Sequence, residues 1–153
     1  MLPLPHRYAV TAVPDPGGGI HLSTNGVRPL PTAAPAEFDG PGDAWSPETL
    51  LVGAAADCFA ITFRGVARAS QLAWHEMACE ATGVLDRVDG VVRFTRIDLH
   101  VRLPLSEGAS EDLAHRVLDK VKRQCLITNS LNADIHLHTT IEARTIDADG
   151  CPV

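Results

Sequence analysis

Four cysteines, at positions 58, 79, 125 and 151, are the residues of this chain with the clearest potential for redox chemistry. Their spacings of 21, 46 and 26 residues include no CxxC pair, so neither a zinc ribbon nor a thioredoxin motif is predicted. Cys58 lies in the apolar run AAADCFAITF (54–63), and Cys125 ends the apolar stripe of a later predicted helix. Both side chains are therefore expected to point toward a core.

These two helix-borne cysteines have two interpretations. Free cysteine is among the most buried residue types, so both can simply fill core space. Alternatively, Cys58 is a nucleophilic thiol and Cys125 resolves its oxidised form by making a disulfide. The two lie 67 residues apart, so only the fold can bring their Cα atoms within the roughly 7 Å that a disulfide needs. The spacing leaves both interpretations open.

The other candidates point less clearly to chemistry. His136 and His138 form an HxH pair on one face of a predicted strand, an arrangement that can hold a metal. No third ligand is apparent, and we predict a solvated face without a metal. Cys79 is expected to pack in the core, and Cys151 to lie in an exposed tail.

The elements that position these residues follow from apolar periodicity and turn residues. In chain order, the sequence predicts short strands at 7–13, 20–24 and 27–30, an irregular connection at 31–47, a helix from 46 to about 72, strands at 75–85 and 91–103, a helix capped by Ser110 that ends near Asn129, and a strand at 134–144. Ser46, Pro47 and Glu48 suit the start of the first helix. This order predicts an α+β fold with a mainly antiparallel sheet.

The first helix is apolar nearly all round over residues 50–63, apart from Asp57. Such a helix is expected to be central and buried. One small sheet cannot cover it, which favours a dimer that wraps the helix. The 153 residues are expected to form one domain, 1–153.

The segment SPETLLVGAAADCFAITFRGVAR (46–68) resembles the OsmC/Ohr family, the osmotically induced and organic hydroperoxide resistance proteins. CLITNSL (125–131) and EFDGPGDAW (37–45) resemble further segments of that family. The resemblance implies an intertwined homodimer that reduces organic hydroperoxides without metal or bound cofactor. It implies that Cys58 becomes a sulfenic acid and then a disulfide with Cys125. A dithiol reductant, such as a lipoylated protein, would then reduce that disulfide.

The same resemblance implies an arginine beside the nucleophilic cysteine, held by the glutamate that Glu48 matches. A thiolate in an apolar pocket needs such a cation to offset desolvation. The family's arginine comes from the N-terminal hairpin turn, which here reads DPGGGIH (15–21) and has none. Arg28 is the nearest substitute, followed by Arg7 and then His21. Asp57, beside Cys58 in sequence, disfavours a thiolate if it lies close.

Composition narrows the function further. The net charge of -6 and the pI of about 5.5 argue against nucleic acid or an anionic membrane as partner. No uncharged stretch of 18 apolar residues predicts a membrane span, and the start does not resemble a secretory signal, so we expect a cytoplasmic protein. The alternatives to a peroxidase are an OsmC-like binding or regulatory dimer and a structural dimer with inert thiols.

Aromatic residues suggest what substrate such a site would take. Phe59, Phe63 and Phe38 are expected to contact the substrate, with Trp45 near them, and to form an apolar mouth. Fatty or aryl hydroperoxides are therefore predicted as better substrates than hydrogen peroxide.

Overall fold

A computed structural model describes residues 3–142, and the chain divides after Leu51 into two compact units. The first unit carries an antiparallel sheet of β1 (Thr11–Pro14), β2 (Ile20–Ser23) and β3 (Leu30–Thr32), followed by the short 3-10 helix η1 (Ala36–Phe38). The helix α1 (Pro47–Ala69) begins in the first unit and continues into the second.

The three N-terminal strands confirm the predicted hairpin but differ in their bounds. The predicted strand at 27–30 is wrong in position, because β3 begins only at Leu30. The amide of Val27 donates to the carbonyl of Thr24 at 3.4 Å, so residues 24–27 form the turn. Arg28 consequently lies in the connection between β2 and β3 and is exposed.

The start of α1 follows the predicted cap. The amide of Thr49 donates to Ser46 Oγ at 3.2 Å, and the amide of Ser46 donates back to Thr49 Oγ1 at 2.9 Å. This reciprocal pair satisfies backbone donors that the first helical turn leaves free. Pro47 occupies the first helical position, where its missing N–H costs nothing.

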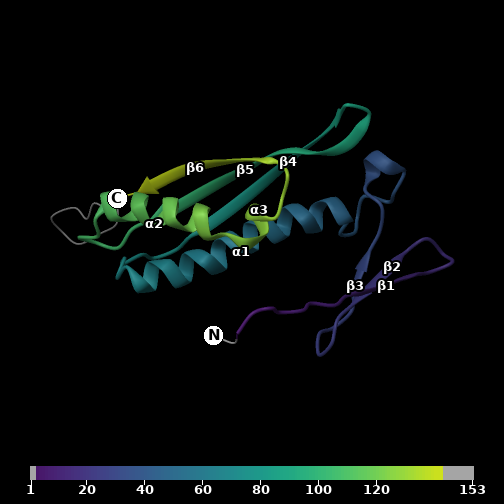
Figure 1. Ribbon diagram of the computed structural model, residues 1–153, viewed down its shortest axis with the longest axis horizontal. Helices are drawn as coiled ribbons and strands as arrows, with labels where there is room; N and C mark the ends of the chain where they lie inside the picture. The colour runs from purple at the N-terminus through teal and green to yellow at the C-terminus, as the bar shows by residue number, and fades with distance from the viewer. Residues whose placement is uncertain (1–2, 143–153) are drawn as a thin grey trace. The chain divides into compact units, whose positions relative to one another are not determined.

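The second unit is built on a three-stranded sheet of β4 (Ala78–Val88), β5 (Val91–Pro104) and β6 (Asp134–Glu142), in that order. β4 and β5 pair antiparallel across a turn at Asp89–Gly90, a dipeptide typical of hairpin turns, whereas β5 and β6 pair in parallel. Parallel pairing needs a crossover connection. The helices α2 (Glu111–Gln124) and α3 (Leu126–Asn129) lie in that crossover, as Figure 1 shows.

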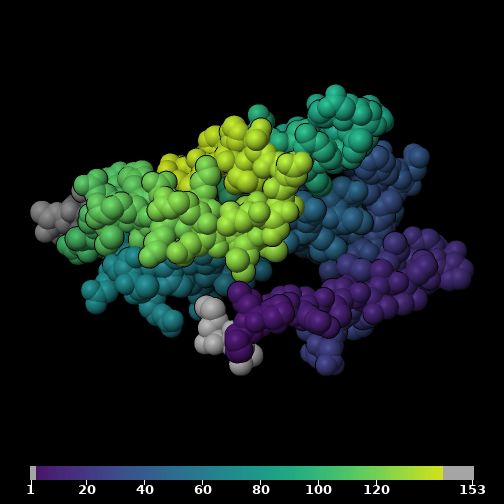
Figure 2. Space-filling view, in the orientation of Figure 1, coloured from purple at the N-terminus to yellow at the C-terminus, as the bar shows by residue number. Residues whose placement is uncertain are grey.

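The core of this unit lies on one face of the sheet. Apolar and polar residues alternate along β5, and its apolar residues from 97 onward are all at most 2% exposed: Ile97, Leu99, Val101 and Leu103. α1 contributes Phe59 and Phe63, which are fully buried, and α2 contributes its predicted apolar stripe. α2 and α3 (green to yellow-green) cover much of the surface in Figure 2. The even-numbered residues of β5 face away from this core.

Two details of the predicted pattern are wrong. Apolar alternation along the strand at 75–85 predicts Leu85 on the core face, but Leu85 is 38% exposed; it follows a register shift in which Val84 pairs with Arg96 and Leu85 with Phe94, so that Thr95 of β5 has no partner in β4. The helix capped by Ser110 was expected to continue to about Asn129. It ends at Gln124, because Cys125 is extended, with φ -67° and ψ 110°.

Burial of α1 is one-sided within the described chain. Phe59 and Phe63 are fully buried, whereas Ala54, Asp57 and Ile61 are exposed. By length and composition α1 could cross a membrane, with a mean hydropathy of 1.6 over its most apolar window. The central helix of a globular domain meets the same criterion, and α1 packs its two phenylalanines into the core of the second unit.

Candidate active site

The fold brings Cys58 and Cys125 together within the second unit. Cys58 lies on α1 and is half-buried, whereas Cys125 is fully buried. The two side chains are hydrogen-bonded to each other. The simple interpretation of two unrelated core cysteines does not account for this pairing.

Four hydrogen-bond donors surround the sulfur of Cys58. Burial is the largest single influence and raises the pKa of this thiol. Hydrogen bonds from the backbone of Ile127, the Cys125 side chain, the backbone of Leu126 and the Thr62 side chain lower the pKa, and together they outweigh burial. The pKa of Cys58 therefore lies below that of an ordinary cysteine, which favours the reactive thiolate.

Cys125 is shifted in the opposite direction. Burial raises its pKa most, hydrogen bonds from Thr128 lower it, and the hydrogen bond and charge of Cys58 raise it again, so the pKa ends above the usual value. As the pH rises, Cys58 therefore ionises first. Cys125 keeps its proton, and its S–H donates a hydrogen bond to the Cys58 thiolate. The pair is asymmetric: Cys58 is half-buried with a lowered pKa, and Cys125 is buried with a raised pKa.

The break between α2 and α3 explains why backbone amides are available to donate to the Cys58 sulfur. Cys125 ends α2, with its amide bonded to the carbonyl of Val121 at 2.9 Å, and its own carbonyl starts α3 by accepting from Asn129 at 3.1 Å. The first amides of a helix have no partner within that helix. Those of Leu126 and Ile127 are thus free to donate to Cys58. Sequence reasoning missed them because the apolar periodicity continues through the break.

No cation is among the groups that shift the pKa of Cys58 within the described residues. The predicted cations Arg28, Arg7 and His21 all belong to the first unit, and all three are exposed. Neutral donors, rather than an arginine, therefore account for the acidity of Cys58 in the second unit. The role of Arg28 at the thiol stays a prediction.

Glu48 sits in the first turn of α1, and its Oε2 is buried without a hydrogen-bond partner among the described residues. A buried carboxylate oxygen is normally paired, so this atom is suited to receive a cation. About 15 Å of helix separates Glu48 from Cys58, and its predicted role in holding an arginine stays a prediction. Asp57 is exposed and is not among the groups that shift the pKa of Cys58.

The three phenylalanines predicted to contact the substrate do not line an opening beside Cys58 in the described chain. Phe59 and Phe63 are fully buried, and Phe63 packs edge-on against Trp74 with ring centroids 5.1 Å apart. As core residues of this chain, these two rings are not placed to form a substrate mouth. Phe38 is 53% exposed and belongs to η1 of the first unit.

Two aliphatic side chains flank Cys58 instead. Ile61 follows it by three residues on α1 and is 61% exposed, and Leu126, whose amide donates to the sulfur, is 75% exposed. Residues three apart are neighbours on a helix surface. An apolar molecule approaching Cys58 would meet these side chains.

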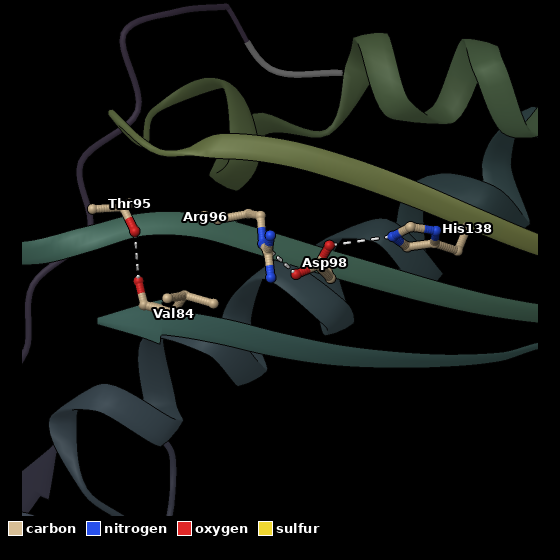
Figure 3. Close-up of polar contacts among 5 residues, drawn as sticks. All are labelled: Val84, Thr95, Arg96, Asp98 and His138. Carbon is tan, nitrogen blue, oxygen red and sulfur yellow. Dashed lines mark hydrogen bonds and ion pairs between the residues drawn. The ribbon is translucent and has the colours of Figure 1, made fainter. Parts of the chain in front are cut away.

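The HxH pair lies on the solvated face of the sheet, as predicted. His138 Nε2 is 3.2 Å from Asp98 Oδ1, and Arg96 Nε is 2.8 Å from Asp98 Oδ2 (Figure 3). The ring of His138 stacks on His100 with centroids 4.5 Å apart. No group of three metal-ligating side chains suited to a metal occurs among the described residues.

Cys79 lies on β4 and is half-buried. Burial, and then the charge of Cys125, raise the pKa of Cys79 to about 11. This thiol therefore stays protonated at neutral pH and is a poor nucleophile, in keeping with a packing role. Cys151 lies outside the described residues.

Comparison with known proteins fits this arrangement. The family model for OsmC-like proteins matches residues 40–140, which include both cysteines of the pair. The chain belongs to the OsmC family. A relative, the uncharacterized protein YmaD of Bacillus subtilis (strain 168), is 31% identical over 106 residues, covering 67% of this chain and 71% of YmaD.

Solved structures show the same OsmC fold. An OsmC-like protein from Mycoplasma pneumoniae matches with a TM-score of 0.79 at 19% identity, covering 91% of this chain and 99% of that one. An organic hydroperoxide resistance protein from Elizabethkingia anophelis matches with a TM-score of 0.71 at 21% identity, covering 92% and 99%. The predicted α+β class and the central position of α1 are thereby confirmed.

Proposed function

We propose that this OsmC-family protein is a thiol peroxidase that reduces organic hydroperoxides. The observation that supports it most is the hydrogen-bonded pair of Cys58 and Cys125 with opposite pKa shifts. A nucleophilic thiol must be ionised and reachable, and a resolving thiol must be close and held in reserve. Cys58 and Cys125 meet these two requirements respectively.

The reaction balances with these two residues and one dithiol. The Cys58 thiolate attacks the terminal peroxide oxygen, the O–O bond breaks, and the departing alkoxide takes a proton to become an alcohol, which leaves Cys58 as a sulfenic acid. Cys125 attacks the Cys58 sulfur, the S–O bond breaks, and hydroxide leaves with the Cys125 proton as water. A dithiol reductant, such as a lipoylated protein, then exchanges with the disulfide and restores both thiols.

The exposed aliphatic rim favours organic over inorganic peroxides. Ile61 and Leu126 offer apolar surface beside the sulfur, which an alkyl or aryl tail can cover and hydrogen peroxide cannot. The hydroperoxide resistance protein from Elizabethkingia anophelis supports the same substrate class by its name. Cumene hydroperoxide should therefore react faster than hydrogen peroxide.

The assembly we propose is a cytoplasmic homodimer with one OsmC-like domain per chain. The family match at 40–140 extends across the division after Leu51, which supports a single domain. The exposed apolar side of α1, with Ile61 61% exposed, offers a surface for a second copy.

The test is a stoichiometric reaction with cumene hydroperoxide, followed by intact mass and peptide mapping. We expect two thiols to disappear and a 58–125 disulfide to form. Cys125→Ser should stop at a Cys58 sulfenic acid that dimedone traps, Cys58→Ser should not react, and Cys79→Ser should behave as the unmodified protein. A Cys58 that stays reduced with stoichiometric oxidant would sink the proposal.

A second candidate is an OsmC-like binding or regulatory dimer with weak or lost peroxidase activity. It is favoured by the lack of a cation among the groups that act on Cys58 in the described chain. Under this alternative, the 58–125 disulfide forms slowly, and the dithiol does not turn the protein over. Steady-state alcohol production with dihydrolipoamide separates the two functions.

A further inference from the structure

Two hydroxyl side chains bond to the carbonyl groups that follow α2. Thr128 Oγ1 donates to the carbonyl of Cys125 at 3.2 Å, and Ser130 Oγ donates to the carbonyl of Leu126 at 2.8 Å. Thr128 is buried, with 5% of its surface exposed, whereas Ser130 is exposed. Bonds from Ser and Thr to a carbonyl three or four residues earlier are common. These two differ from the common case in the peptide groups that they hold.

Each of the two carbonyls belongs to a peptide group whose amide acts on Cys58. The carbonyl of Cys125 shares its peptide plane with the amide of Leu126, and the carbonyl of Leu126 shares its plane with the amide of Ile127. Both amides hydrogen-bond to the Cys58 sulfur. Both peptide groups are trans, so their N–H and C=O groups point in opposite directions. A bond that fixes the carbonyl therefore also aims the amide.

The backbone supports these two carbonyls to different extents. The carbonyl of Cys125 also accepts from the amide of Asn129 at 3.1 Å. The amide of Ser130 donates to the carbonyl of Ile127 at 3.0 Å, rather than to that of Leu126. The hydroxyl of Ser130 thus takes the place of the helical bond that its own amide would make to the residue four positions earlier.

We propose that Thr128 and Ser130 are positioning residues, whose hydroxyls hold the peptide groups between residues 125 and 127 with their amides directed at the Cys58 sulfur. This inference rests on the proposed peroxidase function and deepens it, since it identifies what keeps the donors to the nucleophile in place. Hydrogen bonds to a charged acceptor are stronger than those between neutral groups. Amides that are correctly aimed therefore favour the thiolate over the thiol.

Loss of either hydroxyl should have a distinct pH signature. Thr128→Val matches threonine in shape, and Ser130→Ala changes an exposed side chain, so both variants should fold. A peptide group that has lost one bond at its carbonyl can turn, which weakens its amide bond to Cys58. Each variant should therefore slow Cys58 alkylation by iodoacetamide roughly two- to fivefold at pH 6 to 7. At high pH, where Cys58 is ionised in every variant, the rates should converge.

Asn129 provides a matched control in the same turn. Its Nδ2 donates to the carbonyl of Arg123 at 3.0 Å. That carbonyl shares its peptide plane with the amide of Gln124, which is not among the groups of the described chain that act on the Cys58 sulfur. Asn129→Ala should therefore lower the melting temperature at most, and leave the Cys58 midpoint unchanged.

The experiment measures Cys58 alkylation in the reduced full-length protein between pH 5 and 10, resolved by peptide mass spectrometry. A midpoint that moves to higher pH in Thr128→Val and in Ser130→Ala, and returns in Thr128→Ser and in Ser130→Thr, supports the proposal. An unmoved midpoint, or one that the hydroxyl-keeping variant does not restore, overturns the assignment for the residue concerned. A shift of the same size in Asn129→Ala overturns it for both, because the stability of the turn would then set the midpoint.

The same variants distinguish this proposal from the peroxidase function. Alkylation reports the thiolate whether or not the protein reduces hydroperoxides. Shifted midpoints in a protein that never forms the 58–125 disulfide support the role of Thr128 and Ser130 and reject the peroxidase. Unshifted midpoints in a protein that turns over cumene hydroperoxide reject that role and keep the peroxidase.

Discussion

Replacing Cys125 tests whether the buried thiol activates Cys58 before any oxidation occurs. Cys125 is fully buried, keeps its proton to higher pH than Cys58, and is hydrogen-bonded to it. Cys125→Ala removes this donor, and Cys125→Ser replaces it with a hydroxyl. The pKa of Cys58 should therefore rise in the alanine variant and stay low in the serine variant.

The size of this pKa change follows from how much the Cys125–Cys58 hydrogen bond contributes at a half-buried sulfur. A hydrogen bond contributes about 0.5 to 1.5 kcal/mol net, and we take the middle of this range because half-burial of Cys58 leaves part of its charge to solvent. About 1 kcal/mol corresponds to a roughly fivefold lower ratio of thiolate to thiol. Because the hydrogen bond lowers the pKa of Cys58, its removal should reduce the fraction of Cys58 thiolate. The full reduction should be seen below the Cys58 midpoint, and the difference should disappear at high pH, where Cys58 is ionised in both proteins.

Thiolate absorbance at 240 nm, followed during a pH titration in Cys79→Ser background, measures this ratio. The melting temperature of each variant controls for the cavity that alanine leaves, expected to cost about 1 kcal/mol. Superimposable titrations of the alanine variant and the unmodified protein would refute the argument. A serine variant shifted as far as the alanine variant would refute it as well.

Three further predictions concern the surroundings of the pair. Gly83→Ala should lower the urea midpoint at unchanged slope, by about 1–3 kcal/mol, because an added Cβ would lie 2.6 Å from side-chain atoms of both Phe94 and Val52; an unchanged midpoint would mean that the helix does not approach the strand there. Leu126→Ser should raise KM for cumene hydroperoxide roughly three- to tenfold and leave the rate with hydrogen peroxide unchanged; equal losses with both peroxides would contradict a substrate contact. Cys79, with its pKa of about 11, should stay unmodified by iodoacetamide at pH 8, where about one molecule in a thousand is ionised, and modification as fast as that of Cys58 would show that burial does not keep this thiol protonated.

The sequence predicted those parts of the fold that rest on periodicity over many residues. The alternation of β5 identified its four core residues, and the Ser110 cap and apolar stripe identified α2. Short N-terminal strands were placed less well, because prolines and turns, rather than side-chain alternation, set their bounds. The register shift between β4 and β5 was not predicted, because the extra residue, Thr95 of β5, is of an ordinary strand-forming type.

The sequence predicted the two cysteines of the candidate site but not the groups that donate hydrogen bonds to Cys58. Cys58 and Cys125 were identifiable from family-like segments around them. The amides of Leu126 and Ile127 were not, because backbone groups carry no residue identity and their release depends on one extended residue at Cys125. Thr62 could have been found from its spacing of four residues after Cys58.

The parallel pairing of β5 and β6 has a consequence for how the protein is made. The β4–β5 hairpin pairs two strands that are adjacent in the chain, whereas β6 can pair with β5 only after the whole crossover has been synthesised. That crossover carries Cys125. A nascent chain that has not reached residue 125 therefore contains Cys58 but not Cys125. We expect the redox pair to assemble in the last step of folding, so that incomplete chains contain the nucleophilic cysteine without the means to resolve it.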